Sequence, residues 1–274
     1  MSAIRFDEVS KQFPPSAGSS EQGSTYAVRG LSFQVERGEL VAVVGKTGCG
    51  KSTMFNLLIG LTAPSSGAVS VLGRDPFGDF ARLAGKVGVV FQGDRLLPWR
   101  SALSNVEYGL ELLKARGADR TQVARHWLCK LGLEAHMDKY PHALSGGMRQ
   151  RVSIARAFAT DPEILLCDEP FSALDEINAV LLRNELRRLV KESNKTGMLV
   201  THSIREAMDV GDRILVLRAP GHVVADFRVA DMLASAGEDS LKRHILDAMG
   251  QDVAALERDA AVAAARAKAV GSAA

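Results

Sequence analysis

The sequence predicts an α/β fold built around a mainly parallel sheet, with a helical subdomain inserted into it. Short β-rich runs alternate with helical stretches along most of the 274 residues. Residues 40–44 (LVAVV) and 164–167 (ILLC) are continuously apolar, as central parallel strands buried on both faces are. Helices between such strands imply crossover connections. Residues 98–159 lack strand runs and carry helical periodicity, which predicts the inserted subdomain.

Taken in order, the expected strands are residues 4–6, 32–35, 40–44, 69–72, 87–91, 164–167, 198–201 and 214–217. Residues 14–25 (PPSAGSSEQGST) are all turn-forming or polar, which predicts a flexible surface loop. We expect one sheet-containing domain over residues 1–230, with the helical subdomain at about 98–159. A helical extension or tail is expected over residues 231–274.

Composition narrows the class of protein. The chain is 46% hydrophobic and 24% charged, which is ordinary for a soluble globular protein. A net charge of +2 argues against a polybasic nucleic-acid binder, so no nucleic-acid partner is expected. No run approaches the ~18 apolar residues of a membrane span, and the first 13 residues have no apolar block typical of a signal peptide. We therefore expect a cytoplasmic chain that reaches a membrane only through a partner.

Residues 45–52 (GKTGCGKS) match the phosphate-binding pattern G-x-x-x-x-G-K-[ST]. The run follows an expected buried strand and precedes an apolar helix at 53–61, which is the strand–loop–helix context that phosphate binding by this pattern requires. Glycines let backbone amides approach the phosphates, and the helix directs its positive end toward them. Lys51 would bind the β- and γ-phosphates, and the Ser52 hydroxyl would ligate Mg²⁺. The expected nucleotide contacts from this loop are Gly45, Lys46, Thr47, Gly48, Cys49, Gly50, Lys51, Ser52 and Thr53.

Cys49 lies in this loop, and two interpretations of it stay open. A bound nucleotide would shield its thiol from alkylation, or the residue is simply a small one that the loop tolerates. The three cysteines are odd in number and far apart, which predicts neither a disulfide framework nor a zinc site.

Two further strands end in candidate catalytic residues. Residues 164–170 (ILLCDEP) deliver Asp168 and Glu169 at the carboxyl end of a strand, where open α/β sheets bind ligands. Asp168 would hold Mg²⁺, and Glu169 would act as general base on the attacking water. Residues 198–202 (MLVTH) end in His202, which is interpreted as a γ-phosphate sensor that orients the water. The alternative for a lone histidine at a strand end is a cap or surface residue.

Residues 144–151 (LSGGMRQR) resemble the signature of the ABC ATPase family, about 20 residues ahead of the acidic pair. The resemblance extends from about residue 4 to 217 and adds Gln92 in VVFQ as a catalytic and metal-contacting glutamine. It also includes SALD at 172–175, which would place Asp175 at a dimer seam. It implies a P-loop NTPase of ABC type, with a mixed, mainly parallel sheet, an antiparallel β subdomain and the inserted helical subdomain.

The resemblance also implies partners. Ser145, Gly146 and Gly147 stand ahead of an expected helix at 148–159 and would form an anion site at its N-terminus. In the family this site closes over the γ-phosphate held by another subunit. A chain with one copy of each motif would therefore dimerise with a second ATPase subunit, expected to be identical, around two ATP molecules and Mg²⁺.

Two aromatic residues compete for the adenine. Phe13 in SKQF aligns best with the stacking aromatic of the family, and Tyr26 is its rival. Lys46 and Thr47 replace the commoner Pro and Ser of the family's loop, and Ser203 replaces an Asp after the histidine. None of these departures touches a residue expected to contact phosphate.

Residues 96–112 (LLPWRSALSNVEYGLEL) and Met148 are similar to importer ATPases of the nitrate, sulfonate, taurine and bicarbonate group. Trp99 would then contact transmembrane permease subunits, or else pack within the helical subdomain. A solute-binding protein would be an indirect partner, and the chain would sit on the cytoplasmic face of the inner membrane. The alternatives are a lipid or thiamine-precursor transport system, or a soluble ABC ATPase outside transport.

Overall fold

The computed structural model describes residues 2–14 and 25–250. The expected surface loop at 14–25 lies almost wholly outside them, as does the end of the expected tail. Five parallel strands and one antiparallel edge strand form the larger sheet, in the order β5-β6-β7-β3-β8-β9. Its members are β3 (Leu40–Gly45), β5 (Val87–Val90), β6 (Ile164–Asp168), β7 (Thr196–Thr201), β8 (Arg213–Arg218) and β9 (His222–Arg228). Every residue of β3 and β7 is buried, because layers of structure cover both faces of the sheet.

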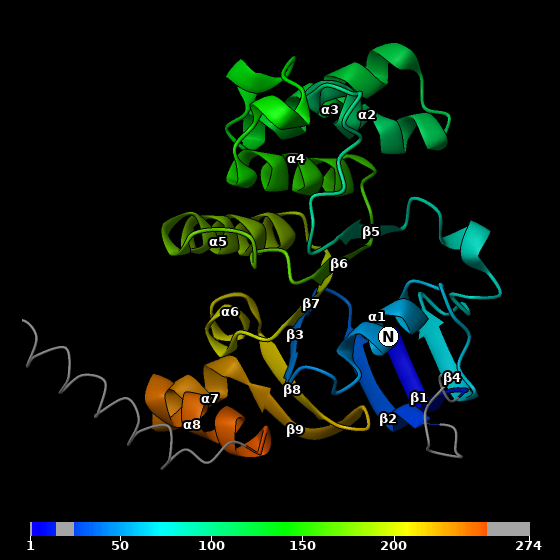
Figure 1. Cartoon of the computed structure of the whole chain (residues 1–274), viewed down its shortest axis with the longest axis vertical. Helices are drawn as coiled ribbons and strands as arrows, with labels where there is room; N and C mark the ends of the chain where they lie inside the picture. The colour runs from blue at the N-terminus through cyan, green and yellow to red at the C-terminus, as the bar shows by residue number, and fades with distance from the viewer. Residues whose placement is uncertain (1, 15–24, 251–274) are drawn as a thin grey trace, which may run out of the picture.

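A smaller antiparallel sheet, in the order β2-β1-β4, lies beside the larger sheet (Figure 1). Its strands are β1 (Ser2–Phe13), β2 (Thr25–Glu36) and β4 (Ser66–Val71). Helix α1 (Lys51–Leu58) is packed between the two sheets, since Met54 and Phe55 share one buried cluster with Phe6 of β1 and Val41 of β3. This packing fixes the direction in which the N-terminus of α1 points.

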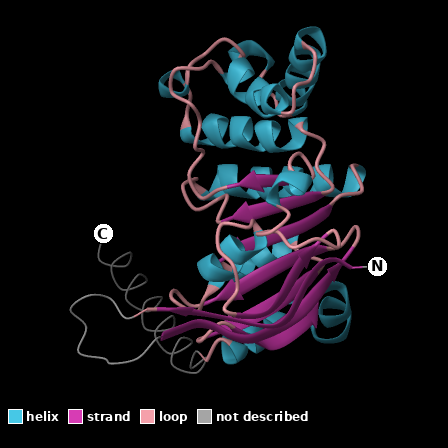
Figure 2. Cartoon of the chain, turned by 90° about the vertical axis from the view of Figure 1, so that its right-hand side faces the viewer, coloured by secondary structure: helices cyan, strands magenta, loops and turns pink. Residues whose placement is uncertain are grey.

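A helical lobe stands above the sheets (Figure 1). It contains α2 (Ala102–Leu112), α3 (Gly117–Lys130) and α4 (Gly146–Ala159), with 3₁₀ turns η2 (Glu134–His136) and η3 (Pro141–Ala143). Helix α5 (Glu176–Glu192) lies between this lobe and the sheet, and one continuous apolar core joins them. Figure 2 shows the same succession of helical and strand layers from the side.

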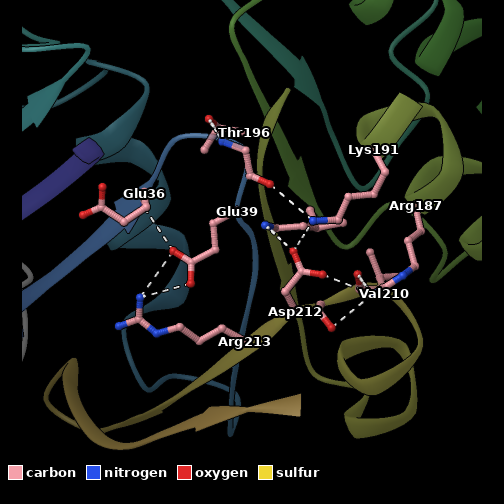
Figure 3. A network of polar contacts seen from close by, with 11 residues as sticks. Glu36, Glu39, Arg187, Lys191, Thr196, Val210, Asp212 and Arg213 are labelled. Carbon is pink, nitrogen blue, oxygen red and sulfur yellow. Dashed lines mark hydrogen bonds and ion pairs between the residues drawn. The ribbon is translucent and has the colours of Figure 1, made fainter. Parts of the chain in front are cut away.

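The amino ends of the central strands are fastened by a polar network (Figure 3). The carboxylate of Asp212, just before β8, accepts from the backbone of Leu40 at 3.0 Å and from Arg187 at 3.2 Å, and also binds Lys191. Arg213 pairs with Glu39 at 3.5 Å. These contacts tie α5, β3 and β8 together at one edge, which leaves the opposite edge, at the carboxyl ends of the strands, for the site.

Several element boundaries differ from the expected ones. Strands β1 and β2 are each 12 residues long, well beyond the expected 4–6 and 32–35, because their outer halves alternate too weakly for the apolar pattern to mark them. Strand β9 was missed because none of its residues is fully buried and it contains no long continuous apolar run. Helices α1 and α4 begin two residues earlier than expected, directly at their glycine-containing starts.

Residues 229–248 form two helices packed on the core. They are α7 (Val229–Ala236) and α8 (Glu238–Ala248), and Leu241 and Ile245 of α8 are fully buried. Between β7 and β8 lies α6 (Ile204–Val210), and η1 (Phe80–Leu83) precedes β5. The C-terminal end of α8 lies against the phosphate-binding loop, because Lys46 Nζ donates to the carbonyl of Gly250 at 2.9 Å.

Candidate active site

The glycine-rich loop joins β3 to α1 at the carboxyl edge of the sheet. Gly50 is the N-cap of α1 with φ of 106°, and no side chain caps the helix, so its first amides remain available to an anion. A Cβ at Gly50 would lie 2.5 Å from the carbonyl oxygen of Ala27. A Cβ at Gly45 would lie 2.5 Å from the carbonyl oxygen of Leu217. Only glycine lets the loop pass this close to its neighbours.

Lys51 is held over this loop. Its side chain is buried, and Nζ donates to the carbonyls of Gly45 at 2.6 Å and Lys46 at 3.2 Å. A cavity of about 210 Å³ opens beside it. The cavity is lined by Ala27, Thr47, Gly48, Gly50, Lys51, Ser52, Thr53 and Glu169. The structure thus brings most of the expected loop residues to one cavity together with the expected general base.

Two loop residues direct their side chains elsewhere. Lys46 reaches Gly250 at the end of α8, as described above, so only its backbone remains to contact phosphate. Cys49 is 3% exposed, and its sulfur packs beneath Gly45. The protein itself therefore shields the Cys49 thiol, which removes the premise that a nucleotide would be needed to protect it from alkylation.

Glu169 lies at the meeting point of three strands. Its carboxylate accepts from Nε2 of Gln92 at 3.3 Å and lies 3.1 Å from Nδ1 of His202. These residues follow β5, β6 and β7, which are neighbours in the sheet, so their carboxyl ends bring the three side chains together. The backbone of Glu169 has φ of 45°, a conformation that non-glycine residues rarely adopt and that is common at functional sites.

Asp168 is half-buried beside Glu169. Burial raises the pKa of its carboxyl above the usual range, the charge of Glu169 raises it further, and Lys51 and Arg95 oppose the shift. Two adjacent carboxylates in such a setting favour a bound cation. The hydroxyl of Ser52 and the amide oxygen of Gln92 add the hard oxygen ligands that Mg²⁺ prefers. The donor set at this edge therefore fits the expected metal.

The signature forms the N-terminus of α4. Ser145 is its N-cap, with Oγ accepting from the backbone of Met148 at 3.3 Å, and Gly146 and Gly147 are its first residues. A Cβ on Gly147 would lie 3.9 Å from the Leu174 side chain, so the signature lies beside SALD of its own chain. Figure 1 places α4 in the helical lobe and α1 between the sheets below. The N-termini of α1 and α4 therefore belong to separate parts of the chain.

Comparison with known proteins agrees with this geometry. The ABC transporter family matches residues 28–172. The chain belongs to the ABC transporter family. An uncharacterised ABC transporter ATP-binding protein of Methanocaldococcus jannaschii is 43% identical over 72% of this chain and 73% of its own length. The taurine import ATP-binding protein TauB of Escherichia coli (strain K12) is 39% identical over 75% of this chain and 79% of its own length.

Solved structures confirm the predicted fold class. A dimeric ATP-binding cassette in a post-hydrolysis state, bound to ADP and Pi, has a TM-score of 0.73 and 33% identity, covering 82% of this chain and 98% of that one. The cbiO1 of Clostridium perfringens, part of the ABC transporter complex cbiONQ, has a TM-score of 0.75 and 26% identity, over 89% and 94% of the two chains. The protein is therefore an ABC ATPase, and it binds and hydrolyses ATP.

In this ABC ATPase, both candidate adenine-binding aromatics lie at the same end of the antiparallel sheet. Phe13 pairs with Thr25, and Tyr26 pairs with the residue before Phe13. Phe13 is 45% exposed and Tyr26 37%. Ala27, next to Tyr26, lines the cavity beside the loop. Both rings are therefore within the same part of the surface, and the choice between them stays a prediction.

Trp99 is 71% exposed, so the interpretation that it packs inside the helical lobe is wrong. The turn that carries it is fixed by buried Asn105, whose amide nitrogen donates to the carbonyls of Leu97 and Arg100 at 3.1 and 3.0 Å.

Near Gln92 the ABC ATPase also has an apolar cavity of about 270 Å³, which sequence reasoning missed. It is lined by Leu58, Ile59, Leu61, Phe80, Leu83, Ala84, Val87, Val89 and Phe91.

Within residues 2–14 and 25–250, no helix has the length and apolar character needed to cross a bilayer.

The signal for the missed cavity was present in the sequence as Leu61 and Phe80, two large apolar residues next to turns. Both are more than half exposed. Periodicity could not separate them from core residues, because it reports the face of an element and not what covers that face.

Proposed function

We propose that this ABC ATPase powers the import of a small anionic solute such as nitrate, sulfonate, taurine or bicarbonate. The role in ATP hydrolysis rests on one observation. Gln92, Glu169 and His202 converge beside the loop that holds Lys51. The import half is supported by TauB proteins of several bacteria, among them relatives 34% and 41% identical to this chain.

Hydrolysis would proceed by in-line attack of water on the γ-phosphate, with electrostatic positioning supplying most of the acceleration. The loop amides and Lys51 would hold the β- and γ-phosphates. Glu169 would accept the proton of the water, while His202 orients the water and contacts the γ-phosphate. Gln92 also binds the Glu169 carboxylate and lies next to the apolar cavity, so it would couple the site to that surface.

Ser52, Asp168 and Gln92 would hold Mg²⁺, which supplies charge neutralisation of the phosphates when bound. Phe13 would stack on the adenine, with Tyr26 as the alternative. Alanine at each position separates them, since loss of the stacking ring should weaken nucleotide binding about tenfold, the equivalent of ~1–1.5 kcal/mol. The other alanine variant should bind within twofold of wild type.

Two chains would assemble head to tail. Ser145, Gly146 and Gly147 of one chain would close over the γ-phosphate held by its partner, and Asp175 would lie at the seam. The separation of α4 from α1 within one chain supports this arrangement, as does the dimeric relative bound to ADP and Pi. Asp175 is fully exposed and caps α5 by accepting from the backbone of Asn178 at 3.1 Å.

A permease segment would dock in the apolar cavity beside Gln92, with Trp99 as an aromatic anchor. Leu61 and Phe80 line this cavity and are 65% and 58% exposed. The chain would thereby be held at the cytoplasmic face of the membrane, and a solute-binding protein would join the assembly through the permease.

The proposal is tested by pull-down of tagged Glu169→Gln protein with MgATP in mild detergent, followed by mass spectrometry. This variant should hydrolyse ATP about 10²–10⁴ times more slowly, because a general base contributes that factor. It should retain a second ATPase chain and a multi-span permease. The exposed Glu163 lies at the opposite end of β6, so Glu163→Gln is the matched control and should hydrolyse ATP at the wild-type rate. Recovery of only soluble partners would refute the transport assignment, and rapid hydrolysis by Glu169→Gln would refute the general base.

A further inference from the structure

The turn that carries His202 is closed by a ring of hydrogen bonds. The Thr201 hydroxyl donates to Oε2 of Glu206 at 2.5 Å and accepts from the backbone of Ser203 at 3.0 Å. The Ser203 hydroxyl in turn accepts from the backbone of Glu206 at 3.3 Å, as the N-cap of α6. His202 lies between Thr201 and Ser203, so the two bonds of the Thr201 hydroxyl span His202 and constrain its backbone.

This ring is a modified capping box. In the ordinary arrangement, a glutamate three residues after the N-cap binds the backbone N–H of the cap residue itself. Here Ser203 gives that N–H to Thr201, and Thr201 relays the bond to Glu206. The ordinary box would hold only the start of α6. Inclusion of Thr201 extends the constraint across His202 to the last residue of β7.

Glu206 is buried, so a carboxylate at this helix start costs desolvation free energy. It is 9% exposed, and Thr201 is fully buried. Burial raises the pKa of the Glu206 carboxyl, while the Thr201 bond and the charges of Arg183 and His202 lower it and the charge of Glu169 raises it. Because an uncharged residue would avoid this desolvation, stability of α6 alone does not account for the carboxylate.

Arg183 of α5 lies within ion-pair distance of the same carboxylate. Its side chain is 2% exposed and lies 3.9 Å from Glu206, 3.1 Å from Asp209 and 2.9 Å from Glu176. Glu176 is the first residue of α5 and directly follows Asp175. A single buried guanidinium therefore connects the start of α5 to the turn of His202.

We propose that Glu206 is a positioning residue for His202, acting through Thr201 and anchored by Arg183; this rests on the proposed role of His202 in the site. The His202 side chain is 59% exposed and contacts Glu169 at 3.1 Å, so the fixed turn beneath it determines where the ring lies. Because Arg183 also binds Glu176, displacement of Asp175 by a second chain would reach His202 through two ion pairs of the same guanidinium.

The test is Thr201→Val, which keeps the shape of the side chain and removes the hydroxyl. We expect kcat for ATP to fall about 10–100-fold with KM nearly unchanged, since misplacing a catalytic group by about 1 Å has effects of this size. Thr201→Ser restores the hydroxyl and should recover kcat to within about threefold of wild type. Glu206→Gln keeps an acceptor for Thr201 but loses the charge that Arg183 binds, so its kcat should be intermediate.

Thr196→Val is the matched control. Thr196 is at the other end of the same strand, is also buried, and its hydroxyl accepts one backbone bond, from Gly38 at 3.1 Å. The same substitution there should destabilise the fold similarly and leave kcat within about twofold of wild type. An equal loss of kcat in the two valine variants would overturn the proposal, since the effect would then be one of stability.

A second readout does not depend on hydrolysis. The chain has six histidines, and the ring signal of His202 in a ¹H–¹³C spectrum is assigned by its absence in His202→Gln. Thr201→Val should shift this signal and Thr196→Val should not. An unmoved His202 signal in Thr201→Val overturns the positioning role. If the ring shifts as expected but kcat does not change, positioning stands and the proposed role of His202 in hydrolysis fails.

Discussion

Two glycines of the phosphate-binding loop offer a sharp test of why this loop needs glycine. Gly48 has φ of 81° and Gly50 has φ of 106°, so alanine is strained at both positions. A Cβ at Gly48 would meet nothing within 4 Å, whereas a Cβ at Gly50 would lie 2.5 Å from Ala27 O and 3.0 Å from the Cα of Gly221. Comparing the alanine substitutions at these two positions therefore separates the cost of backbone strain from the cost of a steric clash.

The expected magnitudes follow from these contacts. Placing a Cβ in the left-handed region costs roughly 1–2 kcal/mol, which is the whole expected loss for Gly48→Ala. Gly50→Ala adds a clash with backbone atoms that cannot rotate away, and overpacking of this kind costs typically about 1–3 kcal/mol. We therefore expect Gly50→Ala to lower the free energy of unfolding by about 2–5 kcal/mol in total.

The assay is urea unfolding of both variants, monitored by circular dichroism, with the free energy of unfolding extrapolated to water. The contrast between them should be about 1–3 kcal/mol, with Gly50→Ala the less stable. Equal losses, within about 0.5 kcal/mol, would refute the reasoning, because the close approach of the loop to Ala27 would then have no energetic consequence.

Three further outcomes are expected. Lys51→Ala should weaken ATP binding by roughly 10–100-fold, which is the effect of losing a charged hydrogen bond of ~1.5–3 kcal/mol. The affinity is measured by equilibrium titration with a fluorescent ATP analogue, and an unchanged affinity would contradict the role of Lys51. Ser145→Arg should bind ATP as a monomer yet fail to dimerise with MgATP in size-exclusion chromatography; a stable dimer would contradict the proposed seam. The raised pKa of Glu206 means that the folded state keeps its proton at higher pH than the unfolded state, so its contribution to stability falls as pH rises above the ordinary value of 4.5. Glu206→Gln should flatten that part of the pH–stability curve, and an unchanged slope would show that the buried carboxyl is not its source.

The sequence predicted the strands of the parallel core because each one is visible in its own short stretch of residues. Strands β3 and β6 are runs of consecutive apolar residues, so their burial on both faces is visible without knowing their neighbours. Strand β9 has no such run, and it exists because β8 offers it an edge to pair with. Helix α8 falls within the expected helical extension, and its buried Leu241 and Ile245 are one turn apart, but the core surface that they cover is set by tertiary packing.

The functional residues likewise divide into those that a short stretch of sequence reveals and those that only tertiary contacts reveal. Sequence reasoning found Glu169 and His202 because each lies at the end of a strand of apolar residues, and the family resemblance added Gln92. It missed Arg183 and Glu206, although Ser203 and Glu206 have the spacing of a capping box. That spacing predicts a helix start, whereas the relay through Thr201 and the ion pair to α5 depend on how two helices pack.

By itself, the sequence determined where the phosphate loop and the signature lie, because each is a contiguous glycine-containing segment at a helix start, where free backbone amides suit an anion. Only the tertiary structure decided that Gln92 and His202 meet on Glu169, that Lys46 reaches Gly250, and that Trp99 faces solvent. These are contacts between segments distant in the chain. Their geometry is set by strand order and by the packing of helices on the sheet, and neither is encoded in any short stretch of residues.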